Sequence, residues 1–374
     1  MSKNVEIAKD LHSDKSTTDS ATRSKMGRKL QIVRFLVRIC VAVAARFWKL
    51  CSSALLILFL VYWFTGALIA LGFFIVAVIG IFFNAQDMLL YYPEQPPNSR
   101  LYVMLPNAYQ MPYENHFVNT SDGVKINLVL VKHPKPNVPT IIYFHGNAGN
   151  VGHRLMNTHA LFEQCKYNIL LVEYRGYGKS EGSPSQGGLY KDAEAAMDFL
   201  LKRTDIDRNK LIVFGRSLGG AVAVHLASQS LYERHIAVLM IENTFSSLPD
   251  IARTLFDFPF LKYLPDILVK AKYRSISRLP TIKVPTLFLS GLSDSLIPPR
   301  MMDTLHTSNC VKTKFCNFVM LNCEKGLDLL SPLTTMSSIT GRTKKRNDHL
   351  EEHIMRLGCP KDTIRLLLIL LMRF

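Results

Sequence analysis

The feature that most constrains this chain of 374 residues is a run of 37 positions, from Leu50 to Gln86, that contains no charged residue. About 20 apolar residues are enough for a helix to cross the hydrocarbon core of a bilayer. A secretory signal has a much shorter apolar region and a cleavage site with small residues. The run therefore predicts an uncleaved signal-anchor over residues 50–86, with membrane lipid as its partner.

The charges on either side of this run predict its orientation. Eight basic residues and no acidic residue lie between Arg23 and Lys49, whereas Asp87 and Glu94 follow the run. Basic flanks are retained on the cytosolic side of a membrane. The charges thus predict a single-pass type II protein with a cytosolic N-terminus and a lumenal or extracellular domain.

A second topology also fits the apolar run. Two short spans that turn near Thr65-Gly66 would form a hairpin and return the domain to the cytosol. The tripeptide Asn119-Thr120-Ser121 is a sequon, so Asn119 is a candidate glycosylation site if the domain is lumenal.

The region before the apolar run divides into two parts. Residues 1–27 are polar and charged, a composition that predicts a disordered cytosolic tail. Residues 28–49 carry basic residues near helical spacing, which fits an amphipathic helix on the membrane surface or the first turns of a longer membrane helix. Part of the net charge of +16 lies in this flank. With no zinc-finger, RRM or KH pattern elsewhere, a nucleic-acid partner is not expected.

Residues 93–306 have the pattern of an α/β domain. A hairpin is expected around Ser121 to Gly123, and strand-like runs such as TIIYF and YNILLVE then alternate with helical runs such as GLYKDAEAAMDFLLKR. Alternation of this kind predicts a mostly parallel sheet with helices on both faces. Asp192 and Asp198 are expected on a solvated face of one of these helices.

The stretch LIVFGRSLGGAVAVHLAS contains G-x-S-x-G between a strand and a helix. A serine in this position sits on a sharp turn that lifts its hydroxyl out of the sheet, while the next amide faces a developing oxyanion. Ser217 is therefore the candidate nucleophile, with Leu218 N–H as one oxyanion donor. The loop in FHGNAGN offers Asn147 N–H as the second donor. His145 precedes this loop and is expected to have a structural role.

The motifs YFHGNAGNVGHRL, YRGYGKSEG, FGRSLGGAVAVHLAS and LSGLSDSLIPP together resemble the alpha/beta-hydrolase superfamily, and more narrowly its Bem46-like branch. The resemblance implies the alpha/beta-hydrolase fold behind an N-terminal transmembrane helix. It also implies a type II membrane serine hydrolase whose triad follows the order serine, aspartate, histidine. By position in the family pattern, Ser217 is the nucleophile and Asp294 the acid. Glu242, at the end of the preceding strand, is the alternative acid.

The family pattern also places a histidine just after the last strand, and here the sequence departs from it. The last strand is expected over residues 314–321, but Asn322 to Leu330 contains no histidine. Residues 307–374 lose the resemblance and are expected to form a divergent segment, with one last strand followed by irregular or helical structure. His349 is the candidate base, and could reach Ser217 only if residues 322–348 looped out and back.

These features predict a membrane-anchored serine hydrolase that cleaves an ester, thioester or amide acyl bond in a small molecule or a lipidated substrate. Its turnover is expected to be impaired because the histidine is missing from its usual place. The alternative is a catalytically inactive hydrolase-like membrane protein that binds a lipid or a partner. Seven scattered cysteines without a CxxC pair indicate neither a disulfide framework nor a metal site. No metal or organic cofactor is expected.

Overall fold

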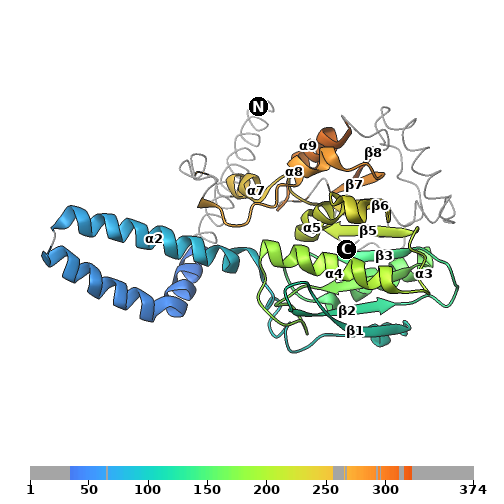
Figure 1. Cartoon of the computed structure of the whole chain (residues 1–374), viewed down its shortest axis with the longest axis horizontal. Coiled ribbons are helices and arrows are strands. Elements are labelled where there is room, and N and C mark those ends of the chain that lie inside the picture. The colour runs from blue at the N-terminus through green and yellow to red at the C-terminus, as the bar shows by residue number, and fades with distance from the viewer. Residues whose placement is uncertain are drawn as a thin grey trace, which may run out of the picture. The chain divides into compact units, whose positions relative to one another are not determined.

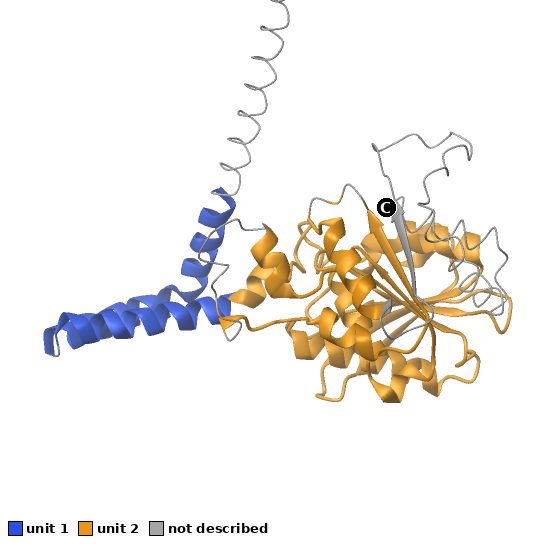
Figure 2. Ribbon diagram, turned by 90° about the horizontal axis from the view of Figure 1, so that it is seen from above, with its two compact units in different colours: residues 1–85 blue, residues 86–374 orange. Residues whose placement is uncertain are grey.

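The computed structural model describes residues 34–64, 66–255, 265, 268–291, 294, 296–310 and 316–321. Two compact units divide the chain, residues 1–85 and residues 86–374 (Figure 2). The expected tail over residues 1–27, His349 and most of the expected C-terminal segment lie outside the described residues.

The described part of the first unit consists of apolar helices. One helix runs over Arg34–Phe64, and α2 (Ala67–Leu90) begins after a break at Gly66, where φ is +87° (Figure 1). Each of these two helices is long and apolar enough to cross a membrane. The expected anchor region over residues 50–86 thus consists of two helices separated by a left-handed glycine, and the choice between a single span and a hairpin stays a prediction. Residues 34–49 form the first turns of the longer helix rather than a separate surface helix.

Eight strands in the second unit form one sheet in the order β1-β2-β4-β3-β5-β6-β7-β8. The strands β1 to β4 span Tyr113–Asn119, Lys125–Val131, Thr140–Phe144 and Asn168–Glu173, and β5 to β8 span Leu211–Arg216, Ile236–Glu242, Thr286–Gly291 and Cys316–Leu321. The strand β2 pairs antiparallel with both β1 and β4, and every other neighbouring pair is parallel. The expected mostly parallel sheet is confirmed. It continues past the expected domain boundary at residue 306 and includes the expected last strand.

Helices cover both faces of this sheet. The principal ones are α3 (Leu155–Cys165), α4 (Gln186–Lys202), α5 (Leu218–Ala227), α7 (Leu248–Leu255) and α9 (Pro299–Cys310), with short α6 (Ser230–Glu233) and α8 (Ser275–Arg278). Alternate residues of each buried strand enter different cores, as the two-residue period of a strand requires. In β3, for example, Ile142 and Phe144 pack in the core that includes α4, α5 and α9, while Ile141 and Tyr143 pack in the core that includes α3.

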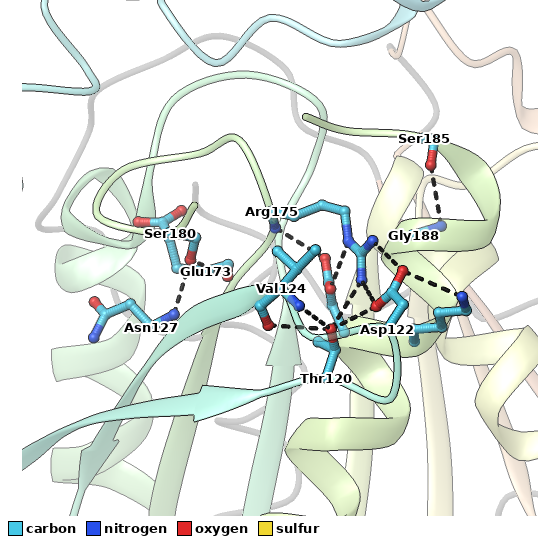
Figure 3. A network of polar contacts seen from close by, with 11 residues as sticks. Thr120, Asp122, Val124, Asn127, Glu173, Arg175, Ser180, Ser185 and Gly188 are labelled. Carbon is cyan, nitrogen blue, oxygen red and sulfur yellow. Dashed lines mark hydrogen bonds and ion pairs between the residues drawn. The ribbon is translucent and has the colours of Figure 1, made fainter. Parts of the chain in front are cut away.

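A buried ion-pair network fixes the loop that follows β4 (Figure 3). The backbone N–H and the guanidinium of Arg175 both donate to the carboxylate of Asp192, each over 2.9 Å. The same guanidinium donates to both oxygens of Asp122 in the β1–β2 turn. Asp192 is fully buried, so the expectation of a solvated position is wrong. Burial raises the pKa of Asp192 to about 6 even though Arg175 opposes this shift.

We expect Arg175→Met to lower the free energy of unfolding by about 3 kcal/mol or more, because it leaves the buried Asp192 carboxylate without a cation. Lys191→Met is the matched control. Lys191 donates to Asp122 over 3.2 Å but its side chain is 43% exposed, and exposed pairs contribute about 1 kcal/mol or less. Denaturant unfolding of the two variants in detergent measures the difference. Equal losses would contradict this account of Arg175.

Candidate active site

Ser217 occupies a strained turn between β5 and α5. Its backbone has φ 55° and ψ −119°, a conformation that residues other than glycine rarely adopt. Two neighbours hold it there: Ser217 N–H donates to the Glu242 carbonyl over 2.9 Å, and the Thr244 hydroxyl donates to the Ser217 carbonyl over 2.7 Å. Strain of this kind persists only when the surroundings impose it, and it is characteristic of a nucleophile elbow.

Two glycines make this turn sterically feasible. A Cβ on Gly215 would lie 2.2 Å from the Gly219 carbonyl oxygen, and a Cβ on Gly219 would lie 2.0 Å from the carbonyl oxygen of Phe144 in β3. Any larger residue at either position would force backbone apart. The G-x-S-x-G spacing is thus explained by the close approach of α5 to β3 and β5.

The loop after β3 lies against Ser217. A Cβ built on Gly146 would be 3.6 Å from the Ser217 Cβ. Within the described residues, the N–H of the next residue, Asn147, donates no hydrogen bond. Leu218 is the first residue of α5, so its N–H has no partner inside the helix. The two amides expected to bind an oxyanion therefore belong to the two segments that meet at Ser217.

A buried acid supports both ends of this loop. Glu173, at the end of β4, accepts from Val151 N–H over 3.1 Å, and its other oxygen lies 3.2 Å from His145 Nε2. The His145 ring is 1% exposed, and its Nδ1 lies 2.7 Å from the Gly146 carbonyl oxygen. These contacts agree with a structural role for His145. Sequence reasoning did not find Glu173, because nothing in the order of residues places it beside this loop.

Two carboxylates are candidates for the acid. Asp294 Oδ1 accepts from the N–H groups of Leu296 and Ile297, each over 2.8 Å, so it also organises the turn after β7. Glu242 is buried, and its Oε1 lies 3.6 Å from Arg216 Nε. Burial raises the pKa of Glu242 to about 7; Arg216 opposes this rise and the nearby Asp294 carboxylate adds to it.

No histidine contacts the Ser217 hydroxyl within the described part of the chain. His225 instead stacks on Tyr190 with the ring centroids 3.6 Å apart, and burial lowers the pKa of His225 to about 4. His153 caps the turn after the Asn147 loop, where its ring nitrogen accepts from Asn150 N–H. His349 lies outside the described residues, so its candidacy stays a prediction.

The fold and motifs have counterparts among known proteins. A model of the alpha/beta hydrolase fold matches residues 139–266. The Alpha/beta hydrolase domain-containing protein WAV2 of Arabidopsis thaliana is 38% identical over 260 residues, which cover 66% of this chain and 83% of that protein. The chain belongs to the alpha/beta-hydrolase family.

Two fungal relatives indicate the branch of the family that the chain resembles. Protein bem46 of Schizosaccharomyces pombe is 35% identical over 64% of this chain and 80% of its own length. A Saccharomyces cerevisiae protein named Uncharacterized membrane protein YNL320W is 32% identical over 65% of this chain and 83% of its own length. The resemblance to the Bem46-like branch is confirmed. In this chain the serine turn and the loop after β3 meet at the carboxyl ends of two neighbouring central strands, β5 and β3.

The buried Glu242 gives a testable pH dependence of stability. Its pKa in the folded chain, about 7, exceeds the ordinary value of 4.5. The folded state therefore binds the proton more tightly, and the associated stability is present at low pH and is lost as the pH rises through about 7. We expect Glu242→Gln to raise the melting temperature relative to the unaltered chain more at pH 8 than at pH 5.

Circular dichroism melts in detergent at the two pH values measure this difference. Glu181→Gln, at an exposed glutamate, is the control and should give the same change in melting temperature at both. A Glu242→Gln change that is independent of pH would contradict the assigned pKa.

Proposed function

We propose that this chain is a membrane-anchored serine hydrolase that cleaves an ester, thioester or amide acyl bond. The observation that carries the proposal is the strained backbone of Ser217, held beside a loop whose Asn147 N–H is unbonded. A family member without a nucleophile would have no need to maintain that strain. Membership of the hydrolase family agrees with this activity.

The reaction follows from the positions of these groups. Ser217 Oγ attacks the acyl carbon while its proton passes to a histidine, and the oxyanion accepts from the N–H groups of Asn147 and Leu218. The histidine then protonates the leaving group as the acyl bond breaks. Water, activated by the same histidine, cleaves the acyl-enzyme and restores the Ser217 hydroxyl. Asp294 is proposed to orient the histidine and stabilise its charge, with Glu242 as the alternative.

The described residues supply no histidine in the position of the base. The histidines of the described residues contact other groups, and His349 and His353 are the remaining histidines after the last strand. We propose His349 as the base, with turnover well below that of a hydrolase whose histidine follows the last strand directly. The same observation favours the second candidate function, a catalytically silent membrane protein that binds a lipid or a partner through the hydrolase fold.

Turnover of a short-chain nitrophenyl ester tests the proposal. Four proteins are compared: the unaltered chain, Ser217→Ala, His349→Ala, and a version in which a Gly-x-His loop replaces residues 322–330. Loss of a triad member costs on the order of 10⁶ in turnover, while the oxyanion hole and binding leave about 10³ to 10⁴ over water. We expect the Gly-x-His version to be at least about 100-fold faster than the unaltered chain.

The controls separate the two candidate functions. Ser217→Ala should remove both turnover and labelling by a fluorophosphonate probe without unfolding the chain, and His349→Ala should remove the turnover that the unaltered chain retains. Failure of the probe to label Ser217 even in the Gly-x-His version would support the silent protein instead. Equal turnover of the unaltered chain and the Gly-x-His version would show that the base is already in place.

For the anchor, we propose the hairpin of two spans rather than the single type II span. The uncharged part of α2, 20 residues from Ala67 to Gln86, would extend about 30 Å, which matches the hydrocarbon core. The preceding helix exposes large apolar side chains such as Trp63 (75%), and α2 does so at Leu68 (85%), which water would not favour. With the basic N-terminus in the cytosol, a hairpin returns the hydrolase unit to the cytosol.

Protease digestion of sealed vesicles tests the topology. We expect digestion from the cytosolic side to remove the hydrolase unit, and we expect no glycan at Asn119, although this residue lies exposed at the end of β1. A protected unit whose mobility changes on glycosidase treatment, but not in an Asn119→Gln variant, would instead establish the type II arrangement.

A further inference from the structure

The last turn of the membrane helix α2 belongs to the hydrolase unit, which begins at Gln86. The Gln86 amide donates to the Leu268 carbonyl over 2.6 Å and accepts from Lys270 N–H over 2.8 Å. Immediately after the helix, the hydroxyl of the buried Tyr91 bonds that of Tyr273 over 2.7 Å. These contacts hold the last turn of α2 and the residues after it within the hydrolase unit.

The same end of the helix bonds directly to the candidate oxyanion loop. The side-chain amide of Asn147 donates to the carbonyl of Leu90, the last residue of α2, over 3.1 Å. In return, Tyr92 N–H donates to the Asn147 carbonyl over 2.9 Å, and Tyr92 forms a parallel β-bridge with Ala148. A helix end leaves its last carbonyls without partners, so Asn147 supplies a donor that α2 itself lacks.

Two further hydrogen bonds, from Tyr177 and His145, also fix this loop. The Tyr177 hydroxyl, in the loop fixed by the Arg175 network, donates to the Asn147 carbonyl over 2.9 Å. His145 Nδ1 lies 2.7 Å from the Gly146 carbonyl oxygen, which shares a peptide plane with Asn147 N–H. A donor to that oxygen fixes the plane and therefore the direction of the N–H. Among the residues that the structure describes, the side-chain amide and the carbonyl of Asn147 have partners, whereas its N–H has none and is left for an oxyanion.

We propose that the side chain of Asn147 is a positioning group that couples the end of the membrane anchor to the oxyanion hole. The inference rests on the proposed function of Ser217. While Asn147 is bonded to Leu90 and Tyr92, its N–H is preorganised and no cost of ordering the loop is met during the reaction. When those bonds are absent, the loop is free to turn its N–H away. Acyl transfer then depends on how the last turn of α2 is held within the hydrolase unit.

The test compares two variants of the full-length chain in detergent. Asn147→Ala removes the donor to the Leu90 carbonyl and keeps the backbone N–H. Tyr177→Phe removes one hydroxyl that donates to the Asn147 carbonyl. Tyr232→Phe is the matched control, because its buried hydroxyl donates to Asp198 on α4, away from the loop.

Two readouts are measured for each protein. The first is the rate of Ser217 labelling by a fluorophosphonate over a range of probe concentrations, since the phosphoryl oxygen of the probe needs the same hydrogen bonds as an oxyanion. The second is amide hydrogen exchange in residues 86–92 and 145–150. Loss of one oxyanion donor costs about 10² to 10³ in rate. We expect misdirection of that donor to lower the maximal labelling rate about tenfold, with the half-saturating probe concentration unchanged.

The result expected is slower labelling in Asn147→Ala and Tyr177→Phe, together with faster exchange in the 145–150 segment of both and in the 86–92 segment of Asn147→Ala. The Tyr232→Phe control should match the unaltered chain. Unchanged labelling, or unchanged exchange in residues 145–150, would overturn the coupling while the role of Ser217 stood. If Ser217 of the unaltered chain were not labelled, the proposed function would fail, and with it the catalytic role of Asn147.

Discussion

A close backbone approach at the start of α5 sets the geometry of the site. Because Gly219 and Gly215 carry no Cβ, α5 begins directly against the carbonyl of Phe144 and against the end of β5. At this approach Ser217 has a φ of 55°. This single constraint orients α5, gives Leu218 the unpartnered first N–H of a helix, and brings the loop after β3 to the serine. Strain at Ser217 persists because the Glu242 carbonyl and the Thr244 hydroxyl bond its backbone on both sides.

Buried polar groups then make the surroundings of the serine rigid. Glu173 lies between His145 and Val151 N–H, and Arg175 lies between Asp192 and Asp122. Pairs of this kind seldom add much net stability, since desolvation of each charge offsets the attraction. Their effect here is directional: Glu173 contacts the loop that carries Asn147, and Arg175 fixes the loop whose Tyr177 hydroxyl donates to the Asn147 carbonyl. A hydrophobic replacement could fill the same volume but would not define the direction of a peptide plane.

Local patterns in the sequence were enough to predict the fold and the sharp turn at Ser217, whose role as nucleophile stays a prediction. The two-residue and helical periods identified the strands and helices, and the turn at Ser217 is encoded by glycines within four positions of one another. The burial of polar side chains could not be predicted from the sequence in the same way. Asp192 looked solvated because its cation, Arg175, is 17 positions away and approaches only when β4 and α4 pack. Likewise the break at Gly66 depends on one φ angle inside an otherwise continuous apolar run. His349 and the tail over residues 1–27 fall outside the described residues, so those expectations stand as predictions.

The contacts of Asn147 unite these separate constraints. An oxyanion donor must keep its direction before the charge develops, because any reorganisation during the reaction subtracts from its effect. The six-residue loop after β3 (residues 145–150) has no such rigidity of its own. Three sources hold it: Glu173 through His145, the Arg175-fixed loop through Tyr177, and the end of α2 through Leu90 and Tyr92. Two of these sources lie within the sheet and its connecting loops. The third is the last turn of α2, which explains why polar Asn147 and Tyr92 meet at the point where an apolar helix ends.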